Sequence, residues 1–287
     1  MNLSRAIDWS SSDDCRLPQF NPKSILHMNS STSWVLNVSK VLTHLDLSAY
    51  SLNWIPHGIA NLNSLQYLDL SDNSLHSVLD GFANMNSLQY LDLSSNELDG
   101  SIIKSFQTLY QIKKLFLSDN KLSGQLNDYL SELCSAQHDL ELLFLDHNPF
   151  SSGPLPNFSW FSSLKSLSFR NTFPILKLSG TLPYNIGQLS NMKDLSLSSN
   201  KLIGIISEAC LSSLSRLELL AVSGNSLSFN FNPNWFHLSN FKNYCASSCI
   251  LETQFPIGLK YQRKLVMLQI SNTSIKDSFP KWFSDIF

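Results

Sequence analysis

Three aspartates at a constant spacing are the first residues in the sequence that could do chemistry. Asp46, Asp69 and Asp92 stand 23 residues apart, each within a copy of the phrase LxxLDLS. On neighbouring parallel strands their carboxyl groups would lie about 5 Å apart, which is roughly the separation found in retaining glycoside hydrolases. A repeated strand gives any residue type this spacing, and catalysis would also need a desolvated cleft that separates the two pKa values. We therefore expect a solvated acidic stripe on an open surface and no enzymatic activity.

The aspartates belong to a longer repeat, LxxLxLxxN, whose substituted copies follow one another 23 to 28 residues apart. Its last position falls at Tyr50, Asn73, Asn96, Asn120, Asn148, Thr172, Asn200, Asn225, Cys249 and Thr273. No single copy can bury its own leucines, so the copies must stack. The pattern predicts an α/β solenoid, a leucine-rich repeat horseshoe of about ten repeats with uncapped ends and a parallel β-sheet on its concave face.

The repeat also predicts which side chains are structural. In one copy, Leu65, Leu68 and Leu70 point into the coil while Tyr67 and Asp69 alternate outward, as in a short strand. The amides that end the template should bind backbone groups, because an unpaired buried amide costs roughly 1–3 kcal/mol. The predicted ladder consists of Asn73, Asn96, Asn120, Asn148, Asn200 and Asn225.

Two of the spacings, at 120–148 and 172–200, are longer than the rest. In the first, Leu130, Leu133 and Cys134 recur at helical spacing, which predicts a longer helix on the convex side. In the second, the extra residues fall in FPILKLSG, before Gly180. We interpret both as bulges of the solenoid.

After the ladder position many repeats read Leu-x-Gly-x-x-Pro, as in LSGTLP at 178–183, or a degenerate version of this motif. Here the chain resembles the plant-type leucine-rich repeat, which implies a second short strand beside the concave sheet. The phrases GPLPNFSWFSSLKSLSFRNT at 153–172 and LVMLQISNTSIKDSFPKWF at 265–283 resemble plant leucine-rich-repeat receptor-like proteins, similar to the ethylene-inducing xylanase receptor group. The resemblance implies the extracellular part of a plasma-membrane receptor for defence or development, which signals through a co-receptor kinase.

The two ends depart from that pattern. Residues 1–38 are interpreted as a degenerate N-terminal repeat remnant, and residues 39–287 as a solenoid that ends within a repeat. The sequence shows no signal peptide, cysteine cap or membrane segment. We interpret the chain as a fragment of the extracellular domain or a truncated gene product.

Residues at the same outward-facing position of successive strands form columns on the predicted sheet, and these columns change in residue type in the middle. One column runs from three aspartates to Phe116 and Phe144, with Lys114 and Arg170 beside them, and we expect both aromatic rings to be exposed. Aromatic patches with a polar rim are typical of protein-binding surfaces, so we expect a protein or peptide ligand here. The predicted concave binding surface consists of Tyr67, Asp69, Tyr90, Asp92, Lys114, Phe116, Phe144, Asp146, His147 and Arg170.

The remaining motifs predict little chemistry. The net charge is −2 with no basic block, which excludes the electrostatic footprint of a nucleic-acid-binding protein. Cysteines and histidines lack metal-ligand spacing, so no metal or cofactor is expected. Cys245 should point outward and Cys249 into the ladder, roughly 13 Å apart and too far for a disulfide. Acceptor sequences for N-glycosylation are predicted at Asn29, Asn37, Asn157 and Asn272.

Two other functions stay open at this point. Polygalacturonase-inhibiting proteins also have about ten plant-type repeats, so the chain could be a soluble inhibitor of a secreted microbial cell-wall-degrading enzyme. A truncated gene product without a function of its own is the other alternative.

Overall fold

The structure, a computed structural model, describes residues 41–285 except 56–57, 79–81, 83, 172, 174–176, 212 and 231–240. Contacts within the chain divide it into residues 1–32 and 33–287, and the description below concerns the second unit. The predicted remnant at 1–38 lies outside the described residues.

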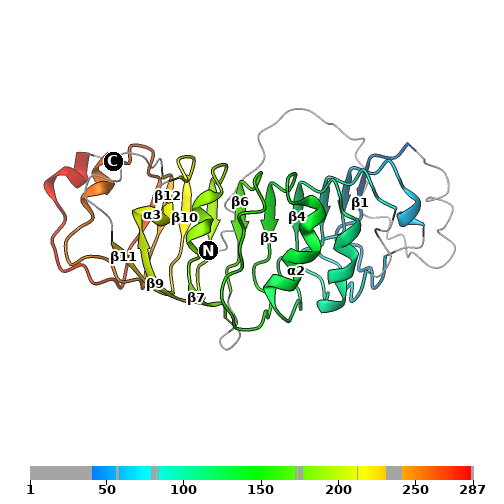
Figure 1. Cartoon of the computed structure of the whole chain (residues 1–287), viewed down its shortest axis with the longest axis horizontal. Coiled ribbons are helices and arrows are strands. Elements are labelled where there is room, and N and C mark those ends of the chain that lie inside the picture. The colour runs from blue at the N-terminus through cyan, green and yellow to red at the C-terminus, as the bar shows by residue number, and fades with distance from the viewer. Residues whose placement is uncertain are drawn as a thin grey trace. The chain divides into compact units, whose positions relative to one another are not determined.

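Short parallel strands form the main sheet of the solenoid, and they follow one another in chain order. Figure 1 shows them from β1, in blue, toward the C-terminal end of the chain. They are β1 (His44–Asp46), β2 (Tyr67–Asp69), β3 (Tyr90–Asp92), β4 (Lys114–Phe116), β5 (Leu142–Phe144), β6 (Ser166–Ser168), β8 (Asp194–Ser196), β10 (Leu219–Ala221), β12 (Asn243–Cys245) and β13 (Met267–Gln269). The predicted solenoid with one parallel sheet is confirmed.

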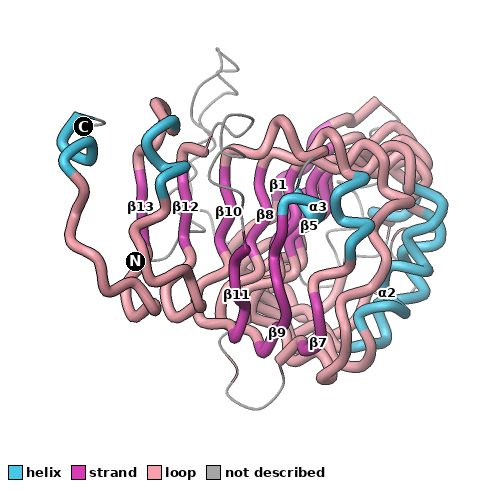
Figure 2. The backbone as a smooth tube through the Cα atoms, turned by 60° about the vertical axis from the view of Figure 1, so that its left-hand side comes forward, coloured by secondary structure: helices cyan, strands magenta, loops and turns pink. Residues whose placement is uncertain are grey.

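A second sheet of three strands accompanies the main one, in the order β11-β9-β7. Its strands are β7 (Ser179–Thr181), β9 (Lys201–Ser207) and β11 (Ser226–Asn230), and Figure 2 shows them side by side and separate from the main sheet. Gly204 is required where β9 passes β7. Its φ is +97°, and a Cβ there would lie 3.0 Å from Thr181 Cγ2, so other side chains would be strained. The sheet is the one that the plant-type resemblance implies.

Short helical segments return the chain from one strand to the next, and those of neighbouring coils pack together. The segments are η2 (Ile59–Asn61), η3 (Gly100–Thr108), α2 (Leu126–Glu132), η4 (Leu133–Ala136), η5 (Tyr184–Gln188), α3 (Glu208–Leu211), η7 (Ile257–Tyr261) and η8 (Lys281–Asp285). The longer coil at 120–148 holds α2 and η4, as its spacing predicts. Leu130 and Leu133 are buried there, whereas Cys134, expected on the same helical face, is exposed.

Leucines of successive coils fill the interior of the solenoid, and the asparagine ladder closes its turns. Asn120 is 5% exposed. Its Nδ2 donates to the backbone oxygens of Leu93 at 2.9 Å and Leu117 at 3.2 Å, and its Oδ1 accepts from the Leu98 N–H at 3.0 Å. Asn148 donates to the Leu117 oxygen too, at 2.9 Å. Each of these strand carbonyls therefore accepts from its own ladder amide and from that of the next coil.

The ladder is incomplete at both ends of the described solenoid. Tyr50 is exposed, and its backbone N–H donates to Asn73 Oδ1 at 3.1 Å. Cys249 Sγ donates to the Val222 oxygen at 3.4 Å, and Thr273 Oγ1 to the Ile270 oxygen at 3.1 Å. These substitutes make fewer hydrogen bonds than an asparagine, because neither carries an amide.

Candidate functional site

A line of five adjoining rings on the face of β1 to β5 that points away from the solenoid interior is the most distinctive surface of the solenoid. We call it the aromatic stripe, and it consists of His44, Tyr67, Tyr90, Phe116 and Phe144. Successive ring centroids lie 5.7, 4.2, 5.2 and 5.2 Å apart. His44 extends the stripe by one ring and was not predicted as a site residue. Its place in the same column as Tyr67, 23 residues earlier, is the signal that could have found it.

The stripe changes column between β3 and β4. Tyr67 and Tyr90 face each other in register, but the strand partner of Tyr90 is Lys114, and Phe116 pairs with Asp92. The rings of Tyr90 and Phe116 meet diagonally, tilted by 41°. Diagonal neighbours on adjacent strands are within reach of aromatic side chains, so the stripe stays continuous.

Phe116 and Phe144 are half-buried, which corrects the expectation that they are exposed. Their rings stack at an angle of 15°, so each covers a face of the other. Lys114 beside them is exposed. The middle of the sheet therefore presents apolar ring edges next to one cationic side chain.

The carboxylates of Asp46, Asp69 and Asp92 form a second line beside the stripe, which we call the acidic column. Each carboxylate accepts a 2.9 Å hydrogen bond from the backbone N–H two residues further on. This aspartate turn closes the end of the strand, a structural role that the recurring Asp-Leu-Ser phrase could have indicated. The hydroxyl groups of Tyr67 and Tyr90 lie 3.4 Å from Asp69 and Asp92, respectively.

Desolvation increases along the acidic column. Asp46 is exposed, and Asp69 and Asp92 are partly buried. Burial raises the pKa of Asp92 to about 6, although its hydrogen bonds from Ser94 lower that pKa. Burial also raises the pKa of Tyr67 to about 12. Asp92 is therefore less solvated than expected for an open acidic stripe.

Asp146, His147 and Arg170 are less exposed than expected for a binding surface. Asp146 is 6% exposed, and its Oδ1 accepts from Ser168 Oγ and from the Arg170 N–H, both at 2.6 Å. Its carboxylate is thus used inside the protein, and burial raises its pKa. His147 Nδ1 lies 2.8 Å from Asp119 Oδ1. Arg170 is half-buried, and its Nε has no hydrogen-bond partner among the described residues.

The predicted cysteine and glycan positions also have defined surroundings. Cys245 lies in the outward column between Ala221 and Gln269, as expected, but it is 3% exposed, with its Sγ 3.9 Å from Met267 Sδ. It is free, as is Cys249. Asn157 and Asn272 are exposed, whereas Asn29 and Asn37 lie outside the described residues. Within residues 41–285, as far as they are described, no cluster of three metal-ligating side chains occurs.

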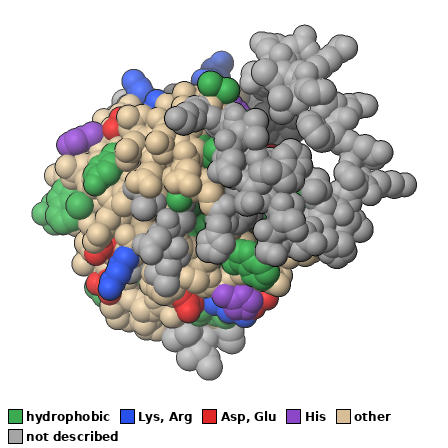
Figure 3. Space-filling view, turned by 90° about the vertical axis from the view of Figure 1, so that its right-hand side faces the viewer, with side chains coloured by type: hydrophobic (Ala, Val, Ile, Leu, Met, Phe, Trp, Pro, Cys, Tyr) green, Lys and Arg blue, Asp and Glu red, His purple; other side chains and the backbone are tan. Residues whose placement is uncertain are grey.

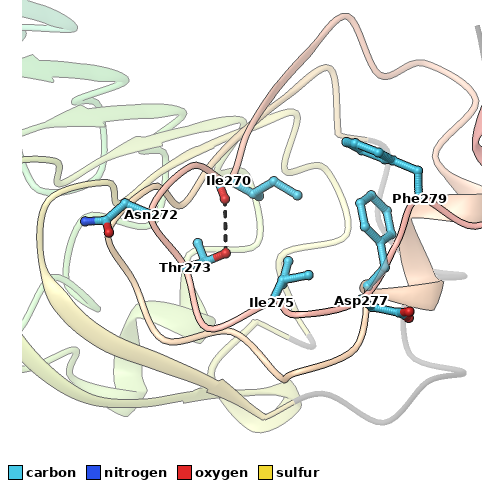
Figure 4. Close-up of a pocket in the computed structure, with 7 residues that line it drawn as sticks. Ile270, Asn272, Thr273, Ile275, Asp277 and Phe279 are labelled. Carbon is cyan, nitrogen blue, oxygen red and sulfur yellow. Dashed lines mark hydrogen bonds between the residues drawn. The ribbon is translucent and has the colours of Figure 1, made fainter.

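A pocket of about 250 Å³ opens in the last coil. Ile270, Thr273, Ile275 and Phe279 line it, and Figure 4 shows the hydrogen bond from the Thr273 hydroxyl to the Ile270 oxygen. In earlier coils the positions of Ile270 and Ile275 are filled by fully buried leucines such as Leu70 and Leu75. The pocket is therefore the open interior of an edge coil.

No helix in the described part of the chain is long and apolar enough to cross a bilayer. The surface in Figure 3, where its atoms are described, is mostly neutral and polar. This agrees with the charged fraction of the sequence, which is only 15%.

Comparisons with known proteins agree with this geometry. Residues 40–98 match the leucine rich repeat family. The receptor-like protein EIX1 of Solanum lycopersicum is 40% identical over 81 residues, which are 28% of this chain and 8% of that protein. The chain thus corresponds to a small part of this relative.

Two solved structures share the fold. The TDR receptor superimposes with a TM-score of 0.71 over 88% of this chain and 47% of that chain, at 23% identity. The plant peptide hormone receptor RGFR1, in complex with RGF2, has a TM-score of 0.62 over 87% of this chain and 47% of that chain, at 25% identity. The resemblance to plant leucine-rich-repeat receptor-like proteins is confirmed.

Proposed function

We propose that this chain, a leucine-rich repeat solenoid that resembles plant receptor-like proteins, is a non-enzymatic recognition module. It binds a peptide or an extended protein segment on its main sheet. The aromatic stripe carries the proposal. Its five rings follow one another at 4.2 to 5.7 Å across five strands. Such a line offers a continuous apolar track, and aromatic anchors supply much of the energy of protein interfaces.

The surroundings of the stripe support binding rather than catalysis. The rings of the stripe are held by stacking, and the carboxylates of the acidic column by backbone N–H groups, so the surface is organised before a ligand arrives. A rigid surface loses little conformational entropy on binding. The solved complex of RGFR1 with RGF2 shows that a similar solenoid accommodates a peptide hormone.

The biological setting of the proposal follows from the resemblance. We place the module in the extracellular part of a plasma-membrane receptor-like protein that acts in defence or development and signals through a co-receptor kinase. Exposed Asn157 and Asn272 would carry glycans in that compartment.

Selection of peptides on the immobilised full chain tests the proposal. Phage-displayed random dodecapeptides would be selected on the 287-residue chain and then titrated against Phe116→Ala/Phe144→Ala. The double variant removes two adjacent rings, and we expect at least tenfold weaker binding because each ring buries apolar area worth more than 1 kcal/mol.

The matched control is Trp160→Ala/Tyr184→Ala, which removes two exposed aromatic side chains outside the stripe. It should bind the selected peptides like the wild type. Equal affinities of the wild type and the Phe116→Ala/Phe144→Ala variant would refute the assignment of the stripe as the binding surface.

A further inference from the structure

The first coils carry a one-sided charge. Residues 41–100 contain seven Asp and Glu residues and no Lys or Arg, although the whole chain has 20 basic and 22 acidic residues. Three of the seven, Asp46, Asp69 and Asp92, stand in register on the outer face of the main sheet. Over β1 to β3 the aromatic stripe is therefore flanked by negative charges, and from Phe116 onward it is not flanked by this column.

In the described part of the chain, no Lys or Arg side chain pairs with the acidic column. Partly buried charges are normally paired, because desolvation without a partner costs free energy. Burial accordingly raises the pKa of Asp92. Among the described residues the Asp92 carboxylate thus has no cationic partner, and its charge is available to a ligand.

The carboxylates of Asp69 and Asp92 also have hydrogen-bond acceptor capacity that a ligand can use. In Asp92 the Oδ1 atom accepts from the Ser94 N–H at 2.9 Å, the Ser94 hydroxyl also donates to the carboxylate, and Oδ2 lies 3.4 Å from the Tyr90 hydroxyl. Asp69 repeats this arrangement one coil earlier, with the Ser71 N–H at 2.9 Å and the Ser71 hydroxyl at 2.6 Å on Oδ1, and the Tyr67 hydroxyl 3.4 Å from Oδ2. A carboxylate can accept about four hydrogen bonds. A guanidinium or ammonium group fits these oxygens in charge and in hydrogen-bonding capacity.

The distance to the apolar part of the stripe defines a spacing in the ligand. The centre of the Asp69 and Asp92 pair lies two strands from the centre of the Phe116 and Phe144 pair. Two strand spacings are about 9.5 Å, which an extended peptide spans in about three residues.

We propose that the stripe and the acidic column together recognise a basic peptide segment, in which a Lys or Arg residue lies on Asp69 and Asp92 and an apolar residue about three positions away lies on Phe116 and Phe144. The inference rests on the proposed function and adds the chemical class of the ligand. Charge complementarity selects this ligand over an acidic or neutral one, because Asp46, Asp69 and Asp92 repel an acidic group and attract a basic one.

The selected dodecapeptides provide the test. They should be enriched in Lys or Arg with an apolar residue about three positions away, and their affinity should fall with salt. Against Asp69→Asn/Asp92→Asn we expect roughly tenfold weaker binding, since asparagine keeps the oxygen that accepts from the backbone and loses the charge. Asp72→Asn is the matched control, because this exposed side chain lies in the turn after β2.

A second measurement does not depend on the folding of a variant. Replacing the basic residue of a selected peptide by Glu should weaken its binding to the wild-type chain by at least the same factor. Selected peptides of neutral or acidic composition, or equal affinities for the Asp69→Asn/Asp92→Asn and Asp72→Asn variants, would overturn the inference and leave the proposed function intact. If no selected peptide depends on Phe116 and Phe144, the proposed function itself fails.

Discussion

Replacing Asn120 by alanine tests how the ladder supports the solenoid. Leu93 and Leu117 each offer a carbonyl oxygen that also accepts from the amide of Asn96 or Asn148, so neither oxygen is left without a partner. The Leu98 N–H is different, because Asn120 Oδ1 accepts from it at 3.0 Å. Leu98 is fully buried, so water cannot replace the lost acceptor.

The magnitude follows from this difference. One buried N–H without a partner costs roughly 1–3 kcal/mol, and the shared carbonyls lose only their second bonds. We therefore expect Asn120→Ala to lower the free energy of unfolding by about 2 kcal/mol. Urea denaturation followed by circular dichroism measures this value, with the slope unchanged because the buried area is unchanged.

Thr273→Ala is the matched control. Thr273 occupies the ladder position of the last described coil, is only partly buried, and donates one hydrogen bond, to the Ile270 oxygen. Its loss should cost less than about 1 kcal/mol. A shift of the urea midpoint in Asn120→Ala no larger than in Thr273→Ala would show that the ladder amides do not carry this stability.

Three further substitutions test other parts of the structure. Asp92→Asn should be more stable than the wild type by about 1–2 kcal/mol at pH 7, because the raised folded-state pKa of Asp92 makes the wild type lose stability as the pH rises from about 4 to 6. Thermal melts at pH 3.5 and 7 check this, and an equal difference at both pH values would contradict it. Gly204→Ala should cost roughly 1–3 kcal/mol, since its φ is +97° and its Cβ would approach Thr181; an unchanged urea midpoint would disprove the strain. Lys121→Ala removes an exposed ion pair to Glu97 and should leave the urea midpoint unchanged, so a clear loss would reveal a larger role for that pair.

The sequence predicted the outward columns of the sheet residue by residue. The columns that contain Asp69 and Tyr67 pair in the structure as the template aligns them, through to Gln269 and Met267. This follows because each coil contacts only its neighbours at a constant spacing. A position in the template therefore becomes a position in space.

Burial within a column was not predictable in the same way. Cys245 and Asp146 occupy or flank outward columns, yet both are buried, and Asp146 is held by Ser168 and the Arg170 N–H. Whether an outward side chain reaches solvent depends on the size and polarity of its neighbours on adjacent coils, which the template does not specify.

By itself, therefore, the sequence determined the fold, the strand register and the ladder, because these depend on a pattern that every repeat restates. Only the tertiary structure decided that the rings join diagonally at Tyr90 and Phe116, and that desolvation of the acidic column reaches Asp92. Both features arise from contacts between unlike residues of adjacent coils, where side-chain volume and local solvation, rather than periodicity, set the result.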